Sequence, residues 1–150
     1  MPDVSPGSGS QAGFVSTSGE LPVASATKTV LVVDDDPAVV ETFSRMLKLE
    51  GFRVAAAADP SIGLELAEHV VPDAIVLDLR MPVLGGLQFL RRIRANRSLV
   101  DVPVAIVTGD PFITDTTEAE IRALGAILKF KPMYLEDLVA LVRCLTGTGV

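Results

Sequence analysis

The stretch Val30-Leu31-Val32-Val33-Asp34-Asp35-Asp36-Pro37 decides the fold. Its four consecutive aliphatic residues predict a strand buried on both faces, which is typical of a parallel sheet covered by helices. A second aliphatic run, Ala74-Ile75-Val76-Leu77, also ends on an acid, Asp78. Acids at the carboxyl ends of such strands lie in the crevice where open α/β sheets bind ligands. The sequence therefore predicts a carboxylate site at one edge of a parallel sheet.

Strand-like and helix-like segments alternate from residue 29 onward. Two helices are expected to begin at an Asp-Pro pair, because Asp caps a helix and Pro suits its first turn. We expect strands at residues 30–33, 53–58, 74–77, 102–107 and 127–130, and helices at 37–50, 60–70, 87–95, 114–124 and 135–145. Five strand–helix units predict an α/β fold in which a doubly wound parallel sheet has helices on both faces.

The chain of 150 residues suits one folded domain, which we place at residues 28–146. Residues 1–27 are rich in Gly, Ser, Pro and Ala and predict a disordered N-terminal tail. Residues 147–150 are expected to be a frayed C-terminus.

Composition limits the compartment and the partners. No apolar run approaches the roughly 18 residues of a membrane span, and no secretory signal is visible. The single cysteine, Cys144, allows no internal disulfide and favours a reducing, cytoplasmic location; its place in a helical pattern predicts a buried, unreactive thiol. The net charge of −6 argues against nucleic acid as a direct partner, because phosphate binding needs a basic surface. The only histidine, His69, is expected at a helix end on the surface.

Polar residues end four of the expected strands: the pair Asp34 and Asp35, then Asp78, Thr108 and Lys131. The carboxyl ends of parallel strands share one edge of the sheet, so these side chains should converge. Grouped carboxylates repel one another unless a cation joins them, and oxygen ligands suit Mg²⁺. Such a set suits phosphoryl chemistry, in which one carboxylate oxygen attacks phosphorus while the lysine and the metal neutralise charge. Asp36, the third of the three consecutive acids Asp34-Asp35-Asp36, is interpreted as a helix cap.

On these residues the chain resembles a response-regulator receiver domain of two-component signalling, over residues 28–146. The acid pair of that family matches Asp34-Asp35, and its phosphoacceptor signature resembles Leu77-Asp78-Leu79-Arg80-Met81-Pro82. The switch hydroxyl matches Thr108 in Val107-Thr108-Gly109, and the Lys-Pro motif matches Lys131-Pro132. The order and the spacing of the four motifs also agree with the family, which makes the resemblance specific.

The resemblance implies a flavodoxin-like fold with strand order 2-1-3-4-5. It also implies that Asp78 accepts a phosphoryl group from a histidine kinase or phosphotransfer protein. Mg²⁺ would be held by Asp35, Asp78 and the backbone carbonyl of Arg80, with Asp34 acting largely through water. Lys131 would pair with the phosphoryl group. The chain would then promote only its own phosphorylation and dephosphorylation and would not be an enzyme.

The expected output is contact with another protein. Thr108 would turn its hydroxyl toward the phosphoryl group and alter the surface made by helix 114–124, strand 127–130 and helix 135–145. That surface would bind a downstream protein or support a phosphorylation-dependent homodimer. The alternative to output by protein contact is transfer of the phosphoryl group to another protein in a phosphorelay.

Three positions depart from the family pattern or carry unusual charge. Leu128 stands where an aromatic residue usually accompanies the switch threonine, which leaves Phe130 and Tyr134 as candidates for that part. The pair Gly85-Gly86 replaces the commoner Asp-Gly or Asn-Gly and is interpreted as a tolerated turn change. Arg80 and Asp110, each two residues beyond a site residue, have opposite charge and should face each other, so we expect them to modulate the lifetime of the phosphoryl group.

Two alternatives stay open at this point. One is a receiver-like module that docks partners without phosphorylation. The other is a phosphohydrolase of the haloacid-dehalogenase type with Asp34 as nucleophile and Asp36 as the second acid. That motif wants Thr or Val where Ala38 stands, needs a further acidic pair, and gives no part to Asp78.

Overall fold

The computed structural model describes residues 27–148. Five strands and five helices alternate along this part of the chain, as the sequence predicts. In order they are β1 (Thr29–Val33), α1 (Pro37–Leu49), β2 (Arg53–Ala57), α2 (Pro60–Val70), β3 (Ala74–Leu77), α3 (Gly86–Ala95), β4 (Val104–Thr108), α4 (Asp115–Ala123), β5 (Ile127–Phe130) and α5 (Leu135–Thr146). The expected disordered tail, apart from Thr27, and the last two residues of the expected frayed end lie outside the described residues.

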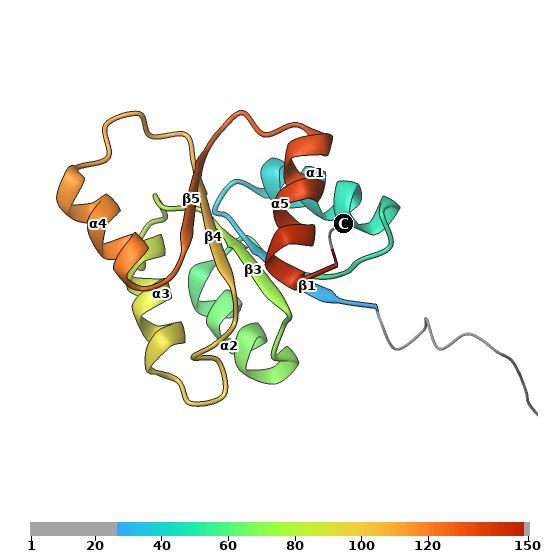
Figure 1. Ribbon diagram of the computed structural model, residues 1–150, viewed down its shortest axis with the longest axis horizontal. Helices are drawn as coiled ribbons and strands as arrows, with labels where there is room; N and C mark the ends of the chain where they lie inside the picture. Colours follow the sequence, from blue (N-terminus) through green and yellow to red (C-terminus); the bar gives the residue numbers. More distant parts are fainter. Residues whose placement is uncertain (1–26, 149–150) are drawn as a thin grey trace, which may run out of the picture.

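The strands form one parallel sheet in the order β2-β1-β3-β4-β5. The predicted flavodoxin-like order is therefore confirmed. Helices α1 and α5 cover one face of the sheet and α2, α3 and α4 cover the other, as Figure 1 shows. No helix in the described part of the chain is both long and apolar enough to span a bilayer.

The central strands are hydrophobic because both of their faces are buried. Residues Val30 to Val33 of β1 expose at most 1% of their surface, and the residues of β3 and β4 expose at most 2%. Alternate residues of each strand enter two separate cores, one centred on Phe89 of α3 and the other on Leu47 of α1 and Leu138 of α5. Burial of both faces fixes the register, because a slip of one residue would exchange the two cores.

Both Asp-Pro pairs begin helices as predicted. The Asp36 carboxylate accepts a hydrogen bond from the Ala38 N–H at 2.9 Å, and Asp59 accepts from the N–H groups of Ser61 and Ile62. Each proline occupies the first helical position, where no N–H donor is needed. The third acid of the triplet therefore caps α1, in agreement with its interpretation from the sequence.

Two expectations need correction. The fourth strand begins at Val104 rather than Val102, because the N–H of Val102 bonds within a turn to the carbonyl of Leu99; it extends to Thr108, whose carbonyl accepts from the Lys131 N–H. Cys144 is exposed, not buried. The buried residues Leu138, Leu141 and Val142 define the inner face of α5, and the helical period turns position 144 away from that face.

The end of α2 offers a test of backbone strain. Val71 has φ 48° and ψ 73°, a left-handed conformation that costs an L-residue about 1–2 kcal/mol and is rarer still for a β-branched side chain. We expect Val71→Gly to stabilise the fold by about 1 kcal/mol after allowance for the greater freedom of the unfolded chain. Urea denaturation measures the change. Glu68→Gly, at an exposed position inside the helix, should instead destabilise by about 1 kcal/mol, and a loss in both variants would contradict the argument.

Candidate functional site

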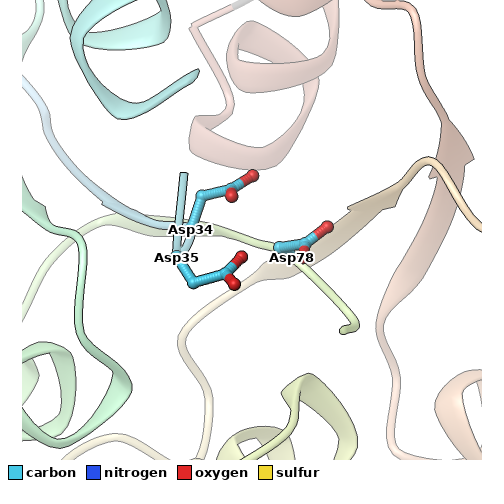
Figure 2. A group of neighbouring side chains, drawn as sticks. All are labelled: Asp34, Asp35 and Asp78. Carbon is cyan, nitrogen blue, oxygen red and sulfur yellow. The ribbon is translucent and has the colours of Figure 1, made fainter. Parts of the chain in front are cut away.

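The predicted acids meet at the carboxyl edge of the sheet. Asp34 and Asp35 follow β1, and Asp78 follows the neighbouring strand β3. One carboxylate oxygen from each lies within 4.8 Å of the other two, and Figure 2 shows the three side chains around one space. Asp34 and Asp78 are buried, at 4% and 7% exposure, whereas Asp35 is exposed. The cluster therefore opens to solvent on the Asp35 side.

Lys131 and Thr108 complete the predicted convergence. The Lys131 Nζ donates to Asp34 Oδ2 at 2.8 Å and to Asp78 Oδ1 at 3.3 Å. The sequence did not indicate that the ammonium group bonds more closely to Asp34 than to Asp78. Thr108 is fully buried at the end of β4, and its Oγ1 accepts a hydrogen bond from the Asp110 N–H at 3.1 Å. The peptide bond between Lys131 and Pro132 is cis.

Burial and the neighbouring charges raise the pKa values of both Asp78 and Lys131. Burial, and then the negative charge of Asp34, raises the pKa of Asp78 above its ordinary value, although Lys131 opposes the shift. Burial alone would lower the pKa of Lys131, but its hydrogen bond to Asp34 and the charge of Asp78 more than offset this and raise it. The lysine therefore stays charged, while Asp78 lacks enough positive charge nearby to compensate for its burial.

The three carboxylates fit a divalent cation. Asp34 already uses both oxygens, since Oδ1 accepts from the Asp36 N–H at 2.9 Å and Oδ2 accepts from Lys131. Asp35 and Asp78 have carboxylate oxygens free of such competition within the described structure. An all-oxygen donor set with a carboxylate whose pKa is raised by burial and like charge suits a hard cation, which would lower that pKa again.

Gly86, interpreted from the sequence as part of a tolerated turn, has a structural role at the site. A Cβ at this position would stand against the carbonyl oxygen of Asp78 and the Cα of Leu79. Its N–H donates to the Leu79 carbonyl at 2.9 Å, which closes the loop after Asp78 against the start of α3. The neighbouring Gly85 has ordinary space around it. The only sequence signal for this close approach was a glycine pair eight residues after an acid-terminated strand.

Arg80 and Asp110 form an ion pair between the loops that follow β3 and β4. Arg80 Nε donates to Asp110 Oδ2 at 2.7 Å, and Nη2 lies 2.6 Å from the same oxygen. The Phe112 N–H, followed by the Arg80 guanidinium, lowers the pKa of Asp110. The contact that the charge pattern predicts is thus present. Its effect on the site is a separate prediction.

Two other residues singled out in the sequence lie away from the carboxylate cluster. His69 is exposed near the end of α2, where its Nδ1 is 2.9 Å from the Glu65 carbonyl oxygen. Leu128, at the position usually held by an aromatic residue, is buried. Phe130, half-exposed, is the direct register partner of Thr108 in the pairing of β4 with β5.

Comparison with known proteins agrees with this geometry. Residues 30–143 match the family described as "Response regulator receiver domain". The chain belongs to this family. Receiver domains are generally not catalytic enzymes, and the fold and the place of Asp78 disfavour the phosphohydrolase alternative.

Named relatives of this receiver domain are regulatory proteins. The transcriptional regulatory protein PrrA of Mycobacterium tuberculosis is 41% identical over 116 residues, which are 77% of this chain and 48% of PrrA. The probable transcriptional regulatory protein TcrX of the same species is 35% identical over 123 residues, covering 81% of this chain and 51% of TcrX. The chain thus spans about half the length of the curated relatives it matches.

Solved structures show the same receiver fold. The chemotaxis protein CheY4 of Vibrio cholerae superimposes with a TM-score of 0.73 at 28% identity, covering 79% of this chain and 98% of CheY4. The N-terminal domain of a response regulator receiver protein from Methanoculleus marisnigri gives a TM-score of 0.64 at 30% identity, covering 79% and 95% of the two chains.

Proposed function

We propose that this receiver domain is a phosphoaspartate signalling switch in which Asp78 accepts a phosphoryl group from a histidine kinase or phosphotransfer protein. The proposal depends chiefly on one observation: the buried carboxylate of Asp78 lies among two further carboxylates and an ammonium group. This arrangement supplies a nucleophilic oxygen, a cation site and a fixed positive charge at one point.

Mg²⁺ is the cation we assign to the carboxylates. Asp35 and Asp78 would hold it with the backbone carbonyl of Arg80, and Asp34 would act largely through water because its own oxygens are already bonded. When bound, the ion would neutralise charge on the transferred oxygens. The chain's own part is to present an Asp78 oxygen for attack at phosphorus while the bond to the donor's leaving group breaks.

Lys131 and Thr108 would respond to the new charge. Formation of phosphoaspartate uses one Asp78 oxygen, and the Lys131 ammonium group would follow the charge onto the phosphoryl oxygens. Thr108 would give up its contact with the Asp110 N–H and donate its hydroxyl to a phosphoryl oxygen. Phe130, the register partner of Thr108 in β5, is the aromatic candidate we assign to this response. The changed surface of α4, β5 and α5 would bind a downstream protein, form a phosphorylation-dependent homodimer, or accompany transfer in a phosphorelay.

Intact-mass measurement with acetyl phosphate and Mg²⁺ tests the proposal. We expect a labile gain of one phosphoryl group that is absent without Mg²⁺ and absent in Asp78→Ala. Asp101→Ala, which removes an exposed acid in the turn before β4, should be labelled like the wild type.

The other outcomes identify the competing functions. Steady consumption of the donor with label on Asp34 would contradict the switch and support a phosphohydrolase. Absence of labelling under all conditions would leave a docking module that works without phosphorylation.

The Arg80–Asp110 pair should slow loss of the phosphoryl group. The pair joins the two loops beside Asp78, so its side chains would partly screen the phosphoryl group from attacking water. We expect Arg80→Ala and Asp110→Ala each to raise the decay rate of phosphoaspartate by a factor of about five. Arg122→Ala, which breaks the exposed Arg122–Glu118 pair within α4, is the control and should leave decay unchanged. Equal decay in all four proteins would contradict the screening role.

A further inference from the structure

A groove of about 720 Å³ runs along α5. Residues at helical spacing line it, so they form one stripe of the helix. Much of the stripe is apolar, because Val139 forms part of the floor and Leu135, Ala140 and Cys144 are exposed beside it. Contiguous apolar surface that is left exposed in this way often marks an interaction site.

The chain enters the described structure at one end of this groove. Thr27 and Lys28 line a smaller hollow together with Glu50 and Arg143, and these two charged residues also line the groove on α5. The hollow and the groove therefore meet at the Arg143–Glu50 ion pair, in which Nη2 lies 3.1 Å from Oε1. In Figure 1 the start of β1 lies near the last turn of α5, which agrees with this placement.

The residues before Thr27 have the length to reach along the groove. From Arg143 back to Leu135 the helix rises by about 12 Å. An extended chain advances by about 3.3 Å per residue, so the path to Thr27 is about 13 Å from Val23 and about 20 Å from Leu21. Both side chains can therefore lie beside the apolar stripe of α5.

The local sequence suits Leu21 and Val23 to this place. They are the large apolar residues nearest to Thr27, in a segment that is otherwise rich in Gly, Ser, Pro and Ala. Alternate side chains of an extended chain point the same way, so both can face the groove. Pro22 between them disfavours helical backbone at Leu21 and favours an extended one.

We propose that residues 21–26 of this chain lie in the groove on α5, with the side chains of Leu21 and Val23 packed against its apolar stripe. Val23 is only four residues before Thr27, and so short a tether holds the segment at an effective concentration of about a millimolar. Contacts too weak to join separate molecules can then keep the groove covered. A second copy of the chain would lack this advantage.

The Arg143–Glu50 pair can bond the backbone of a segment that crosses it. Within residues 27–148 the Arg143 guanidinium donates only to Glu50 Oε1, and no donor reaches Glu50 Oε2. Because a guanidinium has five N–H donors, most of them stay available to backbone carbonyl groups, and the second carboxylate oxygen can accept from a backbone N–H. The two side chains are 43% and 36% exposed, so both are accessible to the segment.

Cys144 reports on whether the groove is covered. It is the only cysteine of the chain, it is exposed within the described residues, and it lines the groove. The segment would shield the thiol from reagents in solution, although the thiol itself takes no part in the binding. The rate at which Cys144 is alkylated therefore measures the fraction of time for which the groove is open.

Alkylation of the whole chain by iodoacetamide, followed by intact mass, tests the proposal. We expect Leu21→Ser combined with Val23→Ser to raise the rate by about five-fold, because the apolar contact is lost while no charge is added beside the thiol. Val4→Ser combined with Val15→Ser makes similar changes farther from Thr27 and should leave the rate unchanged. In the wild type, nuclear Overhauser effects should connect the methyl groups of Val23 with that of Ala140.

Two results would overturn the proposal. Equal rates in the wild type and the Leu21 and Val23 variant, or an equal rise in both variants, would show that these two side chains do not cover the groove. A rate that falls as the protein concentration rises would assign the cover to a second copy of the chain, because a tethered segment gives no such dependence. The measurement needs no phosphodonor, so its failure would leave the proposed function untouched.

Discussion

Lys131→Met should lower the free energy of unfolding by about 2–3 kcal/mol in the absence of metal. The substitution keeps the length of the side chain but leaves Asp34 and Asp78 without their ammonium partner. Removal of one member of a fully buried ion pair costs about 3–5 kcal/mol, and the lower figure applies here because 24% of the Lys131 side chain is exposed. Urea denaturation followed by circular dichroism gives the free energy and checks that the m-value is unchanged.

Lys129 is the matched control for this substitution. It lies two residues earlier, is exposed, and has no ion pair among those of the described structure. Lys129→Met should change stability by less than about 0.5 kcal/mol. Asp34→Asn combined with Lys131→Met should recover part of the loss, because it removes the charge of one of the two buried carboxylates that Lys131 contacts. Equal effects of the two lysine substitutions would show that the ammonium group does not stabilise the cluster.

The sequence predicted the fold and the convergence of the site well because both follow from short-range patterns. Aliphatic runs such as Val30–Val33 indicate strands enclosed on both faces, and the parallel topology places every strand end at one edge. The caps at Asp36 and Asp59 could be read directly, because a cap involves only neighbouring residues. The predicted ends of the strands and helices lie within two residues of those in the structure, because caps and aliphatic runs are local features.

The misses share a different cause. The place of Cys144 in a helical pattern predicts a buried thiol, but only the tertiary packing of α5 decides which face is inner. The bond from Lys131 to Asp34 joins residues 97 positions apart, so no local pattern reports it.

The role of Gly86 was also missed, and it gives the second large effect. Gly86→Ala should destabilise the fold by about 2–3 kcal/mol, because the new methyl group would overlap the Asp78 carbonyl and Leu79 backbone, which cannot rotate away as a side chain can. Gly85→Ala places its methyl group 3.4 Å from the Leu79 carbonyl oxygen, an ordinary contact, and should cost only about 0.5 kcal/mol.

The same overlap links the stability of this loop to the chemistry of the site. Relief of the clash requires the start of α3 to move away from β3, which would displace the backbone that carries Asp78 and the Arg80 carbonyl. We therefore expect Gly86→Ala, unlike Gly85→Ala, to slow labelling by acetyl phosphate by about a hundred-fold, since a misplacement of about 1 Å has an effect of this size. Urea denaturation and the rate of mass gain measure the two consequences separately. If Gly86→Ala lost stability but labelled at the wild-type rate, the glycine would serve packing alone and the loop would position Asp78 by other contacts.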